Sequence, residues 1–269
     1  MGTNYHDSTL LARTKATRYA WVVPAKQAKQ AEQSPEEYLR SAMAARTRAE
    51  RAKWAKMGLA SKSELDDTTH AMLLRQLYLS LFEGRRFHEA HGVALQAAEV
   101  GVLPDVLLQD AARAALASGE LEDGLAHLRE AARVGPASRR AFHYWTLGSV
   151  LFLAHRHDDA AVALARASKT SAGEKPLYKA HLALARIAGG ENVGDIQKTI
   201  DALVASPSGQ GYGRFVLGHL AYAAGAWKVA QQYLQSFVER TREKPPAMAV
   251  ALEGEIRMAR ATLKKIAAR

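Results

Sequence analysis

Two histidine-rich segments have the residue types and spacing closest to those of a metal site. The first, His88-Glu89-Ala90-His91, is one residue short of His-Glu-x-x-His, in which imidazoles four residues apart on a helix hold zinc. The second, His155-Arg156-His157-Asp158-Asp159, gathers two imidazoles and two carboxylates. The spacing of the first is wrong for zinc, and the second falls in a predicted turn, where polar side chains and helix-starting aspartates are expected anyway. The sequence therefore predicts no metal site.

Side chains suited to covalent or phosphate chemistry are missing or wrongly placed. The 269 residues include no cysteine, which excludes disulfides, thiolate metal sites and cysteine nucleophiles. There is no Gly-x-Ser-x-Gly elbow. Gly189-Gly190 and Gly211-Tyr212-Gly213 lack the preceding strand and the Gly-Lys-Ser/Thr ending of a phosphate-binding loop. We predict no catalytic residue and no cofactor, and expect a protein that is not an enzyme.

A recurring sequence motif predicts the helices that carry these residues. In this motif a small turn is followed by a charged pair, a small residue and an apolar helix, and it recurs around Ala90, Gly124, Ala160 and Ala230. The steps between these positions are 34, 36 and 70 residues, the last being two steps of 35. A fixed period of this length is typical of repeat arrays, whose units cannot bury their apolar faces alone. The alternative, an alanine-rich helical bundle, shows the same amphipathic pattern without the fixed spacing.

The period and several motifs resemble the tetratricopeptide repeat (TPR) family. Tyr144-x2-Leu147-Gly148-x2-Leu151 and Leu217-Gly218 fit the signature of the first helix in a unit. The small, large and small residues of the second helix are matched by Ala90/Ala94/Ala97, Gly124/Leu128/Ala131 and Ala160/Leu164/Ala167. The resemblance implies an all-α fold, a right-handed superhelical array of antiparallel helix pairs over residues 67–244, with units at about 71–104, 105–138, 141–174, 176–210 and 211–244. Close approach of the two helices explains the small residues.

The resemblance also implies a binding surface. In TPR arrays the first helices of successive units line a concave groove that holds a peptide or helix of another protein. Carried over to this sequence, the groove residues are Arg75, Leu79, Phe82, Arg113, Phe142, Trp145, Phe152, Tyr212, Phe215, His219 and Tyr222. Aromatic and arginine side chains dominate binding hot spots, so an apolar anchor is expected. Some of these aromatic residues are expected to lie between helices instead.

The two flanks of the array differ in character. Residues 1–33 form a polar and basic arm around a short apolar patch, for which a second interaction site and a mobile tail are equally good interpretations; the contact residues of the arm are Tyr19, Trp21, Val22 and Val23. Residues 34–66 are predicted to hold one basic helix, beginning at the Ser34-x-x-Glu37 capping box and running to about Gly58. Residues 247–268 are predicted to be one amphipathic helix that caps the last unit.

The charge distribution limits the choice of partner. The net charge of +10 divides into +5 for residues 1–66, +1 for 67–240 and +4 for 241–269. The array itself is nearly neutral, which disfavours a continuous phosphate-tracking groove. We therefore expect a cytoplasmic adaptor or scaffold that binds another protein, with the terminal helices as candidates for self-association and with no membrane insertion. The alternative is a nucleic-acid or ribonucleoprotein-associated factor that uses the two basic flanks.

Overall fold

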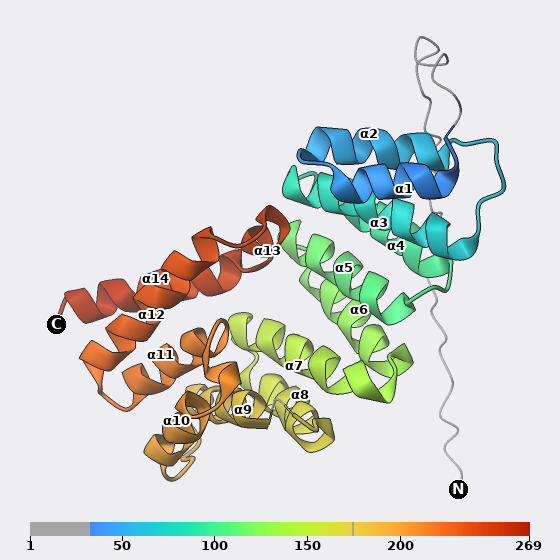
Figure 1. Cartoon of the computed structure of the whole chain (residues 1–269). Helices are drawn as coiled ribbons and strands as arrows, with labels where there is room; N and C mark the ends of the chain where they lie inside the picture. The colour runs from blue at the N-terminus through green and yellow to red at the C-terminus, as the bar shows by residue number, and fades with distance from the viewer. Residues whose placement is uncertain (1–32, 174) are drawn as a thin grey trace, which may run out of the picture.

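The protein is all-helical throughout the part of the chain that its structure describes. The structure is a computed structural model that describes residues 33–173 and 175–269, within which there are fourteen α-helices and no strand (Figure 1). The helices are α1 (Pro35–Ala44), α2 (Arg48–Leu59), α3 (Asp67–Glu83), α4 (Phe87–Glu99), α5 (Pro104–Ala117), α6 (Leu121–Val134), α7 (Ala137–Leu153), α8 (His157–Thr170), α9 (Lys175–Ala188), α10 (Ile196–Val204), α11 (Gly213–Ala223), α12 (Trp227–Arg242), α13 (Pro246–Ala251) and α14 (Glu253–Ala267). A short 3-10 helix, Pro207–Gly209, lies between α10 and α11.

The basic region before the array forms two helices, so the prediction of one continuous helix is wrong. The Ser34 capping box is present as predicted and starts α1. A second capping box follows, in which the Thr47 hydroxyl accepts from the Glu50 N–H and the Glu50 carboxylate accepts from the Thr47 N–H. Thr47 is extended, with φ −120° and ψ 151°, so the chain turns there and α2 runs back along α1. The Thr-x-x-Glu spacing was visible in the sequence and is a helix-start signal.

Five antiparallel helix pairs follow, α3/α4 through α11/α12, at the places where the sequence period predicts them. Their turns share one backbone feature. Arg85, Gly119, His155, Gly190 and Gly225 all have positive φ, between 59° and 91°, and lie 34 to 36 residues apart. In each turn the next residue donates its N–H to the carbonyl oxygen five residues earlier, at 2.9 Å. This is the pattern of a Schellman helix end, repeated once in every unit.

Glycines let the two helices of a pair touch, as the sequence predicts. A Cβ at Gly148 would lie 2.5 Å from Leu164 Cγ, across the α7/α8 contact. At Gly218 it would lie 2.6 Å from Leu234, and at Gly124 it would lie 2.6 Å from Leu116. These separations are shorter than any van der Waals contact between carbons, so a methyl group cannot be added without displacing the leucine that it meets.

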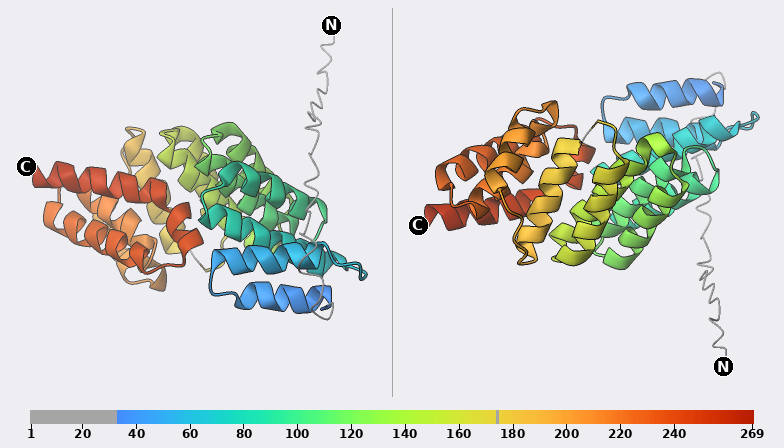
Figure 2. Two further views of the ribbon diagram at one scale, coloured as in Figure 1. Left: turned by 90° about the horizontal axis from the view of Figure 1, so that it is seen from above. Right: turned by 90° about the horizontal axis from the view of Figure 1, so that it is seen from below.

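Successive pairs pack side by side and curve (Figure 1). Seen from two further directions in Figure 2, the N-terminal pair α1/α2 and the C-terminal end of α14 lie at opposite ends of the molecule. The buried core forms two clusters, one centred on α2 to α5 and a larger one from α5 to α14. No helix in residues 33–173 and 175–269 combines the length and apolar character needed to cross a bilayer.

The C-terminal region also departs from the prediction of one capping helix. It is broken at Leu252, where φ is −100° and ψ is 10°. After the break, α14 packs along α12 and α11 and buries Ala259 and Thr262, whereas α13 lies against α3 of the first unit. The C-terminal segment therefore contacts both ends of the array.

Candidate functional site

The first helices of the first two units are joined by a buried carboxylate between two arginines. Arg75 on α3 donates from Nε to Asp110 on α5 at 2.8 Å, and Arg113 donates from Nη1 to the other oxygen of Asp110, also at 2.8 Å. The Asp110 side chain is only 2% exposed, while those of Arg75 and Arg113 are 33% and 36% exposed. Each guanidinium uses one of its five N–H groups in this cluster, so donors remain for a carboxylate from outside.

The next link along the same side joins the second unit to the third. The Gln109 side-chain amide on α5 donates to Thr146 Oγ1 on α7 at 3.1 Å, and that hydroxyl donates to the Phe142 carbonyl oxygen. Phe142 itself is 39% exposed, the largest exposure of any aromatic residue predicted for the groove, and its ring lies 5.7 Å from that of Trp145. Leu79 on α3 is half-buried. We call Arg75, Leu79, Arg113 and Phe142 the inner patch.

The predicted groove is closed in its C-terminal half. The Trp145 ring lies 4.8 Å from that of Tyr212 and 5.9 Å from that of Tyr178, so α7, α9 and α11 touch through their inner side chains. The hydroxyl of Tyr212 donates to the Glu255 carboxylate of α14 at 3.2 Å. These aromatic residues therefore contact one another and leave little surface for a partner.

Four residues predicted for the groove lie in the core: Phe82, Phe152, Phe215 and His219, each between 0% and 8% exposed. Their assignment to a solvent-facing surface is wrong for this structure, because neighbouring helices cover them. The Phe82 ring packs against Phe87 of α4, the Phe152 ring against His181 of α9, and the Phe215 ring against His219 and against Phe237 of α12. Tyr222 lies elsewhere, with its ring 5.1 Å from that of Trp227 and beside the Arg269 guanidinium. The inner patch combines the exposed Phe142 with three partly exposed side chains, whereas the partly exposed rings of Trp145, Tyr212 and Tyr222 pack against other aromatic side chains.

Two histidines are enclosed in the closed half. Burial lowers the pKa of His181 to about 3 and that of His219 to about 4, so both imidazoles are neutral at pH 7. Ser149 Oγ lies 3.5 Å from His181 Nδ1, a spacing that suggests a nucleophile beside a base. However, the hydroxyl already donates to the Trp145 carbonyl oxygen at 2.9 Å, and both side chains are buried. The pair is thus part of the packed interior.

The histidine segments noted in the sequence lie on the second helices and in a turn. His88 and His91 both approach the Glu120 carboxylate, at 3.4 and 3.5 Å, and His91 Nε2 lies 2.9 Å from His127 Nε2. The partner His127 was missed, although it follows His91 by 36 residues, one repeat period. The rings of His155 and His157 contact each other, and that of His157 also contacts Phe152. Within the described ranges, no three His, Cys, Asp or Glu side chains gather where they could hold a metal ion.

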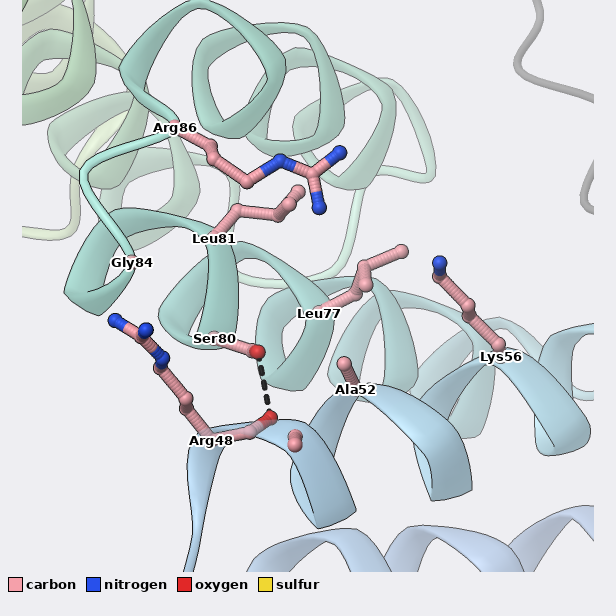
Figure 3. Close-up of a pocket in the computed structure, with 9 residues that line it drawn as sticks. Arg48, Ala52, Lys56, Leu77, Ser80, Leu81, Gly84 and Arg86 are labelled. Carbon is pink, nitrogen blue, oxygen red and sulfur yellow. Dashed lines mark hydrogen bonds between the residues drawn. The ribbon is translucent and has the colours of Figure 1, made fainter.

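A pocket of about 230 Å³ between α2, α3 and the start of α4 was also not predicted (Figure 3). Arg48, Lys56 and Arg86 lie around it, over Leu77 and Leu81. Ser80 donates to the Arg48 carbonyl oxygen at 2.7 Å, and Arg86 pairs with Glu89. The pocket depends on how α2 docks on α3, which no local sequence pattern encodes.

The arm residues Tyr19, Trp21, Val22 and Val23 lie outside the described residues. Comparison with known proteins gives no family assignment: no family model matches this chain, and no curated protein matches it significantly.

Proposed function

We propose that this chain is a non-catalytic adaptor or scaffold of the tetratricopeptide type, whose inner patch binds a helix or peptide of another protein. One observation supports this most directly: an exposed aromatic side chain and two half-exposed arginines share one side of α3, α5 and α7, held in place by links between units. Such side chains are the types that dominate protein-binding hot spots.

The charge of the inner patch suggests what the partner segment contains. Asp110 is buried and neutralises only one of the two guanidiniums, so the three side chains together carry a charge of about +1. A carboxylate can pair with the remaining arginine donors, and an apolar side chain can cover Phe142. The expected partner is therefore a helix or peptide with an acidic residue close to an apolar one.

The proposal is tested by affinity capture from nuclease-treated native lysate, with Phe142→Asp compared with wild type. Val162→Asp is the matched control, since Val162 is 57% exposed on α8, the second helix of the same unit. We expect one stoichiometric protein to be retained by wild type and by Val162→Asp and lost with Phe142→Asp. Equal retention by all three proteins would count against the inner patch.

The nucleic-acid alternative gains no support from the described geometry. It requires the basic flanks to share a face, but α2 and the C-terminal end of α14 lie at opposite ends of the molecule (Figures 1 and 2). If capture of the partner is abolished by nuclease, this alternative replaces the inner patch.

A further inference from the structure

Three consecutive residues at the start of α14 contact three different units of the array. Glu253 pairs with Arg85, in the turn of the first unit. Gly254 lies against α7 of the third unit, where a Cβ would stand 3.2 Å from Leu153 Cδ1. Glu255 accepts the hydroxyl hydrogen of Tyr212, at the start of the fifth unit. This junction holds the two ends of the curve together.

The part of the chain before this junction is weakly held. None of the six residues of α13 is buried, and Met248 is 50% exposed. Its apolar contact with the N-terminal core consists of Ala247 and Val250. The Arg85 and Glu253 side chains are 59% and 36% exposed, and an ion pair so open to water contributes at most about 1 kcal/mol. Pro245 precedes α13, Pro246 is its first residue, and Leu252 breaks the helix after it.

The rest of α14 is anchored firmly. Ala259 and Thr262 are buried, and Ile256, Met258 and Leu263 pack on the larger core cluster. Segments with few buried contacts open more readily than those with many. Any opening is therefore expected to involve α13 and the first turn of α14, and to stop before Ala259.

Glu255 is the buried group at the boundary between these two parts. Glu255 is 7% exposed, and no ion pair to its carboxylate is found among the described residues. Tyr212, the N-cap residue of α11, hydrogen-bonds to its carboxyl group, and Arg257 of α14 is the cation that acts on it. His181 of α9 lies behind Tyr212, with the two rings 5.9 Å apart. The sequence of α13 has no titratable side chain, α7 brings Leu153 and Ser149 to this region, and no charged side chain of α12 bonds to Glu255. An ionised carboxylate here would be desolvated, and because no ion pair forms, the charge of Arg257 offsets that cost only in part.

We propose that residues 246–255 form a strap across the inner side of the array, and that ionisation of Glu255 releases it. Because α13 lies against α3, which carries Arg75 and Leu79, release changes access to the inner patch. That regulatory role rests on the proposed function, whereas the opening itself does not.

The direction of the pH response follows from the carboxyl group. Burial raises the pKa of Glu255 to about 7, against an ordinary value of 4.5. The docked strap therefore prefers the protonated carboxyl. Its stabilisation is complete below about pH 4.5 and is lost as the pH rises through 7. A difference of this size changes the closed-to-open ratio on the order of a hundredfold across that range.

The strap can be followed with two spin labels, because the natural chain has no cysteine to compete for labelling. One label replaces exposed Met248 on the strap, and the other replaces exposed Val162 on α8. We expect a single dominant distance at pH 6 and an additional, more distant population at pH 8.5, with the open-to-closed ratio rising about tenfold. An unchanged distance distribution at the two pH values would overturn the proposal.

Two substitutions in the labelled protein separate the effect of the Glu255 charge from that of the Glu253–Arg85 ion pair. Glu255→Gln removes the charge, so the strap should stay closed at both pH values. Glu253→Gln is the matched control two residues away: it should loosen the strap equally at both pH values and preserve the pH response. A Glu255→Gln protein that opens with pH like the parent would contradict the proposal.

If Glu255→Gln fails to fold, hydrogen exchange on the unaltered chain gives the same answer. After correction for the chemical exchange rate, amides 247–256 should exchange faster at pH 8.5 than at pH 6, while those from Ala259 onward should not. An equal change in exchange rate with pH for all amides of α14 would contradict the proposed strap. Neither measurement involves a partner, so the strap and the inner patch can fail separately.

Discussion

Buried carboxylates are the residues that most clearly link one unit to the next. Asp105 at the start of α5 is 1% exposed; it accepts two hydrogen bonds from Arg139, at 2.7 and 2.8 Å, and lies 2.8 Å from His143 Nε2. Asp110 of α5 likewise links the second unit to the first, by accepting a hydrogen bond from Arg75 of α3. Neither role was predicted from the sequence. Asp105 near the helix start is equally consistent with capping, and the partners of Asp110 come from another helix, which no local pattern indicates.

Asp105 gives a pH-dependent prediction. The hydrogen bonds from Arg139 hold the pKa of Asp105 at about 2, below the ordinary 3.8. Its stabilisation, roughly 2 kcal/mol, is therefore present above about pH 4 and is lost as the pH falls towards 2. Urea denaturation of Asp105→Asn should show a deficit of that size at pH 7 which shrinks at pH 2.5 to 3. A deficit independent of pH would mean that the charge is not involved.

Gly148 gives a prediction on packing. Gly148→Ala should destabilise the protein by about 1–3 kcal/mol, because its methyl group would overlap Leu164 Cγ, despite the better helix propensity of alanine. Gly173→Ala is the control, since no atom lies within 4 Å of the added carbon. Denaturant unfolding measures both changes. The combination of Gly148→Ala with Leu164→Ala should cost less than the sum of the two single changes, and additivity would argue against the contact.

At the scale of the element, the period of the sequence predicted the existence and order of the five helix pairs correctly. The breaks inside both flanks were missed, although Thr47-x-x-Glu50 carried a local signal for the first. The sequence around Leu252 contains no such signal, because the break in the C-terminal helix follows from the docking of α13 on α3. The position of each groove residue within its unit could be predicted from the repeat. The burial of its side chain could not, because burial depends on the packing of neighbouring helices.

The shared turn conformation gives an element-scale prediction. His155 takes a left-handed backbone conformation, with φ 59°, where three other units have glycine. His155→Gly should therefore raise stability by up to about 1 kcal/mol, and Gly119→Ala, with φ 91° at the equivalent turn, should lower it by about 1–2 kcal/mol. Thermal unfolding of both proteins measures this. Destabilisation by His155→Gly would show that the histidine contacts outweigh the backbone strain.

At the scale of the whole molecule, the array is closed by its own C-terminal segment. Trp145 of α7 packs against Tyr212, the N-cap residue of α11, α14 covers the last pair, and α13 returns to α3. Of the predicted groove, the inner patch on the first three units contains the most exposed side chain, Phe142. We therefore propose that a partner binds on one side of α3, α5 and the start of α7.

Site-specific photocrosslinking in the source cells tests that placement most directly. Benzoylphenylalanine is incorporated at position 142 in one protein and at position 162 in a second, matched one. Since only position 142 lies in the inner patch, the account predicts a single abundant protein adduct from position 142 and none from position 162. Equal adducts from both positions, or adducts from position 162 alone, would contradict the central claim that the inner patch is the binding surface.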